Sequence, residues 1–122
     1  MHYKDLRIYQ LAKKLQNELY KELIQIPHYW RIPEIGQAIR SSSSATSNIV
    51  EGHSRKYYPK DYYRFLNISM SSSDETQNHV DEIHQKNLMD LNKSEYFQTN
   101  YKYLAIKTLK LMNLIKSRYF KQ

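Results

Sequence analysis

Residues 37–52 hold four serines in a row, Ser41–Ser44, within a stretch whose apolar residues keep the spacing of a helix. Apolar residues at intervals of three and four lie on one face of a helix. A flexible serine linker would not show such regular spacing. The apolar residues of this pattern are Ile35, Ala38, Ile39, Ala45, Ile49 and Val50. We therefore predict a helix with a slim middle. We expect it to end at Glu51, because Gly52 can adopt the left-handed conformation found just past helix ends.

The chain of 122 residues contains only two glycines and three prolines. So few turn-forming residues disfavour a many-stranded sheet and favour a small number of long helices. A chain of this length buries most of its surface as one domain. We predict an all-α fold and a single domain over residues 1–122. The expected helices cover about 5–26, about 34–51, about 59–83 and a last stretch that begins at Asn92, where Glu95 would complete a capping box.

The two middle helices carry small side chains at mid-length, which favours a close approach of their backbones. The small residues of the third predicted helix are Ser69, Ser72, Ser73 and Thr76. We expect their hydroxyls to bond to carbonyls one turn back. The fourth predicted helix instead has apolar side chains beyond its packing seam, at Leu109, Met112 and Leu114. This stripe is broader than one neighbouring helix covers, which favours a further contact with another subunit.

Lysine and arginine outnumber the acidic residues and give the chain a formal net charge of +7. Such an excess attracts polyanions such as nucleic acid or anionic lipid. The absence of cysteine excludes disulfides and thiolate metal sites. The first residues lack the pattern of a signal peptide, and no apolar run is long enough to cross a bilayer. We therefore expect a soluble, cytoplasmic protein without a membrane partner.

Three parts of the chain resemble a known family. They are Asp5–Ala12, then Gln37–Arg40 leading to Asn48–Gly52, and then Phe65–Ser69 leading to Ser72–Thr76. In order and spacing these residues resemble the four helix bundle proteins called 23S rRNA intervening-sequence proteins. The resemblance implies an antiparallel up-and-down four-helix bundle that assembles as a ring-like homo-oligomer, a pentamer. A similar protein, the accessory variability protein of diversity-generating retroelements, binds nucleic acid and a reverse transcriptase. The family has no established catalytic residues.

The motifs of catalysis and metal binding are incomplete in this sequence. No serine lies in a Gly-x-Ser-x-Gly elbow, and there is no glycine-rich phosphate loop. Asp81 precedes His84 by three residues, but di-iron bundles need that motif twice together with two further glutamates. We therefore expect no enzyme activity, no catalytic residue, no metal and no cofactor.

Two sets of polar residues are candidates for function. The first lies in the segments that carry the resemblance and consists of Arg40, Asn48, Glu51 and Glu75. These residues could line a pocket, but we favour a structural polar network that fixes helix register, because buried charges need partners. The second set interleaves cations and aromatic rings around the start of the third helix: Arg55, Lys56, Tyr57, Tyr58, Lys60 and Arg64.

The second set has two interpretations. Cations that neutralise phosphates beside rings that stack on unpaired bases are typical of surfaces that bind single-stranded or loop RNA. The same residues also suit a subunit contact with a solvated rim. Our first hypothesis is a non-enzymatic homo-oligomer that presents this surface to RNA or DNA. The second is an adaptor that docks a nucleic-acid enzyme such as a reverse transcriptase.

Overall fold

The computed structural model describes residues 1–120, and the regular structure in that range is entirely helical. Two single-turn 3-10 helices, η1 (Tyr3–Asp5) and η2 (His28–Trp30), precede and follow the first long helix. The four α-helices are α1 (Arg7–Leu23), α2 (Pro33–Ser54), α3 (Pro59–Gln85) and α4 (Leu91–Tyr119). None of these four helices has the length and hydropathy needed to cross a bilayer.

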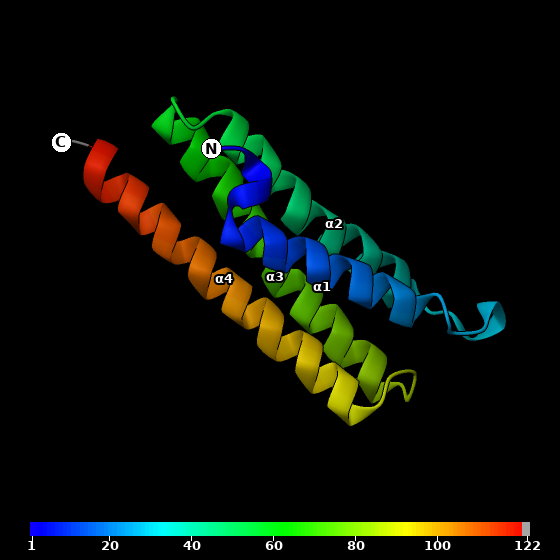
Figure 1. Cartoon of the computed structure of the whole chain (residues 1–122). Coiled ribbons are helices and arrows are strands. Elements are labelled where there is room, and N and C mark those ends of the chain that lie inside the picture. Colours follow the sequence, from blue (N-terminus) through cyan, green and yellow to red (C-terminus); the bar gives the residue numbers. More distant parts are fainter. Residues whose placement is uncertain (121–122) are drawn as a thin grey trace.

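Consecutive helices run in opposite directions and pack side by side (Figure 1). The most extensive packing joins α2 to α3 and α3 to α4, and the shorter α1 contacts α2 and α4. The N-terminus, the α2–α3 connection and the end of α4 all lie at one end of the bundle. The η2 segment and the α3–α4 connection lie at the other. The predicted all-α, antiparallel up-and-down four-helix bundle is thus confirmed.

Two helix starts differ from the prediction. The first long helix begins at Arg7, because Asp5 belongs to η1, where its carboxylate accepts a hydrogen bond from the His2 amide at 3.2 Å. The last begins one residue before Asn92. Its N-cap is Asp90, whose side chain accepts from the Lys93 amide at 2.8 Å. The predicted capping box at Asn92 is therefore wrong, because the carboxylate two residues earlier already satisfies the first turn.

Gly52 has a different role from the one predicted. The α2 helix continues to Ser54, and no glycine in residues 1–120 has a positive φ. The predicted end of the helix at Gly52 is wrong. A Cβ atom at this position would lie 3.1 Å from Cδ1 of Tyr62 and 3.3 Å from Cβ of Phe65. Glycine therefore lets α2 and α3 approach closely near their connection.

The core is aliphatic between α1 and the other helices and hydroxyl-rich between α2 and α3. Along α1, Ile8, Ala12, Leu15, Leu19 and Leu23 form a buried apolar stripe. Between α2 and α3, the Ser69 hydroxyl donates to the Ala45 carbonyl at 2.6 Å, and the hydroxyls of Ser41 and Thr76 lie 2.7 Å apart. We call this contact the hydroxyl seam.

Hydroxyls of the seam also form the predicted bonds within each helix. The Thr76 hydroxyl donates to the Ser72 carbonyl at 2.8 Å, and Ser73 donates to the Ser69 carbonyl at 3.1 Å. The prediction of local bonds is confirmed. The hydrogen bonds that cross from α2 to α3 were not predicted. They fix the register of the two helices, in addition to the close approach that the small side chains allow.

An ion pair joins the start of α2 to the residue after α3. Glu34 is buried in the first turn of α2, and its carboxylate accepts a hydrogen bond from the Lys86 ammonium group. That hydrogen bond lowers the pKa of Glu34 below its usual 4.5 and raises the pKa of Lys86. A carboxyl with a lowered folded-state pKa stabilises the fold above pH 4.5, and this contribution is lost as the pH falls through the folded-state value.

The variant Glu34→Gln should therefore be less stable than the natural chain at neutral pH and similarly stable in acid. Urea unfolding of both proteins, followed by circular dichroism from neutral pH down to about pH 3, measures the difference. The gap in unfolding free energy should narrow below pH 4.5. A gap that stays constant over this range would mean that the ionised carboxylate contributes nothing.

Candidate nucleic-acid interface

Residues 55–58, which we call the α2–α3 turn, connect two antiparallel helices in four residues. The turn is closed by backbone bonds from the Arg55 amide to the Gly52 carbonyl at 2.9 Å and from the Tyr58 amide to the Arg55 carbonyl at 2.8 Å. Pro59 follows at the first position of α3, where its missing amide hydrogen is not needed. The two tyrosine side chains of the turn face solvent. Tyr57 is 83% exposed and Tyr58 is 66% exposed.

The arginines beside the turn are held by a shared ring. The guanidinium carbons of Arg55 and Arg64 lie 5.7 Å and 4.5 Å from the centre of the Phe65 ring. Arg55 also forms an ion pair with Asp61 at 3.5 Å, in which both side chains are largely exposed. Such an exposed pair contributes little to stability. Arg64 and Lys60 are exposed, and neither forms an ion pair within residues 1–120.

A hollow of about 350 Å³ lies between the α2–α3 turn and the end of α4. We call it the basic hollow. Its lining includes Lys56, Tyr57, Tyr62, Leu111, Leu114 and Arg118. The Lys56 ammonium group lies 5.4 Å from the centre of the Tyr57 ring and donates to the Met1 carbonyl at 3.3 Å. Burial raises the pKa of Tyr62, so its phenol stays protonated at neutral pH.

The structure thus brings together all six residues of the predicted basic and aromatic set around one connection. It adds Arg118, which the sequence analysis did not assign to this surface. The signal was available in principle, because an antiparallel bundle returns the end of its fourth helix to the α2–α3 turn. Arg118 is 60 residues or more from the turn in the sequence, so the sequence alone does not show that it is a neighbour.

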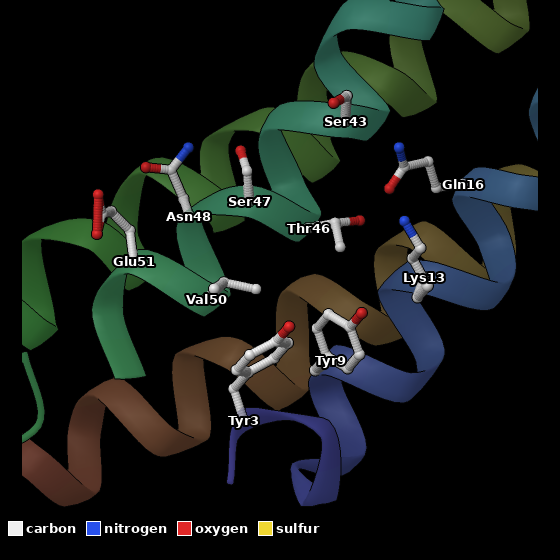
Figure 2. Close-up of a pocket in the computed structure, with 10 residues that line it drawn as sticks. All are labelled: Tyr3, Tyr9, Lys13, Gln16, Ser43, Thr46, Ser47, Asn48, Val50 and Glu51. Carbon is white, nitrogen blue, oxygen red and sulfur yellow. The ribbon is translucent and has the colours of Figure 1, made fainter. Parts of the chain in front are cut away.

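The other predicted set is divided between two grooves. Asn48 and Glu51 line a groove of about 470 Å³ between α1 and α2 (Figure 2). In that view, Lys13 and Gln16 extend from α1, and the rings of Tyr3 and Tyr9 border the groove. The Asn48 amide donates to the Ser44 carbonyl at 2.9 Å, a bond within α2.

Arg40 and Glu75 line a different groove, of about 520 Å³, together with His79 on the outer side of α2 and α3. Both charged side chains are exposed. No hydrogen bond within residues 1–120 joins Arg40, Asn48, Glu51 or Glu75 to one another. The structure therefore does not unite them in one polar network. The hydroxyl seam supplies the buried polar contacts between α2 and α3 instead.

The groups considered for metal chemistry have local partners. Nδ1 of His84 lies 2.9 Å from the Met89 carbonyl, and the Asp81 carboxylate accepts from the Gln85 amide at 2.8 Å. Within residues 1–120, no three side chains of histidine, aspartate or glutamate gather as metal ligands.

A comparison with known protein families covers most of the chain. Residues 4–110 match the family described as 23S rRNA-intervening sequence protein. The chain belongs to this family. The match includes the hydroxyl seam and the α2–α3 turn of this intervening-sequence protein, but it stops before the α4 residues that line the basic hollow.

A solved structure has the same fold. It is the crystal structure of a protein of unknown function from the S23 ribosomal protein family of Bacteroides thetaiotaomicron. The superposition has a TM-score of 0.79 at 13% sequence identity and covers 87% of this chain and 95% of the other. At this identity the likeness concerns the fold alone. No curated protein matches the chain.

Proposed function

We propose that this intervening-sequence protein is a non-enzymatic homo-oligomer that binds RNA or DNA at the α2–α3 end of each bundle. The observation that carries the proposal is the joint exposure of Tyr57 and Tyr58 beside the cations Lys60 and Arg64. An exposed ring packs little of its surface against the core, whereas cations next to stacking rings fit the backbone and bases of an unpaired strand. The net charge of +7 also attracts the polyanionic strand at long range.

Self-association is supported by the outward side of α4. Tyr103, Ile106 and Leu109 are 45%, 47% and 41% exposed, although all three side chains are large and apolar. A second copy of the chain would remove this surface from water. The resemblance described above implies a ring of five. In such a ring one strand meets several copies of the α2–α3 turn, and each further contact forms at a high effective concentration.

Binding to a single-stranded oligonucleotide should weaken steeply with salt. Each neutralised phosphate of a single strand changes the slope of log affinity against log salt by about 0.7. Three contacts per strand would therefore weaken binding roughly 20-fold between about 50 and about 200 mM salt. Filter binding over that range measures the slope, and light scattering on the same sample gives the number of subunits.

The adaptor hypothesis makes the opposite prediction for the isolated protein. If no strand is retained even at the lowest salt, the proposal is wrong. The positive surface would then belong to a protein contact, and pull-down with a nucleic-acid enzyme such as a reverse transcriptase becomes the relevant experiment.

A further inference from the structure

We propose that the basic hollow receives one unstacked nucleobase of a single-stranded segment, with the adjoining phosphates at Lys56 and Arg118. This inference rests on the proposed function, because it names the part of a nucleic acid that this surface recognises. It assigns a ligand class to the side chains of α4 that line the hollow.

The first argument is electrostatic. Lys56 and Arg118 line the basic hollow, and no carboxylate does. Four other hollows on residues 1–120 are each lined by acids as well as bases, for example Lys13 with Glu51 between α1 and α2. The basic hollow therefore carries an unbalanced positive charge, which favours an anionic ligand.

The second argument is the shape and chemistry of the interior. Leu111, Leu114 and Ile115 of α4 form an apolar wall, and Pro59 and Tyr62 of α3 face it. The volume of about 350 Å³ lies near the lower limit for small-ligand sites, about 300–1,000 Å³. The ring system of a single nucleobase fits within this volume. A flat apolar ring that carries a phosphate at its edge satisfies both the wall and the cations.

The third argument concerns the rim. Tyr57 is the most exposed large side chain in the turn, and Lys56 lies against its ring. An aromatic ring with one face near a cation and the other face in water offers a stacking surface to an incoming base. The lining contains no asparagine, glutamine or carboxylate. We therefore expect no selection for adenine or cytosine, because the side chains that most often distinguish these two bases are missing.

The occupant must be unpaired. In a duplex each base is stacked between neighbours and paired at its edge, so only an unpaired or flipped base can place its ring between the α3 and α4 side chains of the hollow. Duplex nucleic acid would meet the same cations through its phosphates alone.

The experiment compares two strands of equal length on the natural protein. One is an ordinary oligonucleotide of about ten nucleotides, and the other is an abasic strand that keeps each phosphate and lacks the bases. At low salt, anisotropy titration should show the ordinary strand binding about 5- to 150-fold more tightly. Equal affinity for both strands would overturn the hollow and the stacking on tyrosine rings, whereas nucleic-acid binding at this end through the cations would still stand. Binding of neither strand would overturn both, and an acidic peptide would become the candidate occupant.

Two variants of Tyr57 locate the effect. Tyr57→Ala should weaken the ordinary strand at least about fivefold and leave the abasic strand unchanged. Tyr57→Phe keeps the ring and should bind as the natural protein does. Because Tyr57 is 83% exposed, both variants should fold normally. A Tyr57→Ala variant that binds the ordinary strand with natural affinity would contradict the proposed stacking.

Discussion

Replacing Ser69 with leucine is expected to lower the free energy of unfolding by about 3 kcal/mol. Ser69 lies in the hydroxyl seam with no exposed surface, and its hydroxyl is 2.6 Å from the Ala45 carbonyl of the facing helix. A leucine side chain has no space between two backbones held at this separation. Either α2 and α3 move apart or the new side chain adopts a strained rotamer. Both outcomes lower the free energy of unfolding, because in a close-packed core the displacement also strains the neighbouring side chains.

The matched control is Ser69→Ala. It removes the hydroxyl but keeps a small side chain, and the Ala45 carbonyl still accepts its backbone hydrogen bond within α2. We expect it to cost about 1 kcal/mol or less. Urea unfolding at one fixed protein concentration measures both variants, since a self-associating chain gains stability with concentration. Similar losses for alanine and leucine would show that the hydroxyl bond, and not the close approach, makes serine necessary there.

The helices were predictable because their signals are local. The apolar spacing of α1 survives in the structure as a buried stripe, and the serine-rich middle of α2 is a helix and not a linker. Pro59 at the start of α3 and the small number of glycines also favoured a few long helices. The order of the helices around the bundle came from the family resemblance, because periodicity identifies a buried face but does not say which helix covers it.

The errors share a physical cause. Gly52 and Asn92 were assigned from rules for isolated helix ends, whereas tertiary contacts decide both positions. Tyr62 and Phe65 of α3 leave little room for a side chain at Gly52, and the Asp90 carboxylate caps α4. Rules for helix ends that use only neighbouring residues therefore did not predict the end of α2 or the start of α4.

The sequence predicts the part of the candidate site that lies in the α2–α3 turn, but not the part that α4 contributes. The cations and rings of the α2–α3 turn are consecutive, so composition alone identifies them. The hollow needs α4 as its second wall, and Arg118 is far from Lys56 in the chain. Arg40 and Glu75 show the reverse case, since they lie close to residues of the seam in sequence yet both remain exposed.

Removing three cations at the α2–α3 end should weaken nucleic-acid binding on the order of 100-fold at low salt. The variant replaces Lys56, Lys60 and Arg64 with glutamine and leaves Arg55, which is paired with Asp61, in place. If each cation contacts one phosphate, the salt slope should become less steep by about two units. Anisotropy titrations at several salt concentrations yield the affinity and the slope together.

The control variant replaces Lys13, Lys14 and Lys21 of α1 with glutamine. These lysines are exposed, and none is in an ion pair within residues 1–120, so the control loses the same three charges without losing a structural contact. If the α2–α3 end is the interface, the control should lose only about threefold in affinity at about 0.15 M salt, because charges more than a Debye length of about 8 Å from a phosphate are largely screened there. Equal losses in the two variants would instead mean that net charge attracts the strand and that no particular surface holds it.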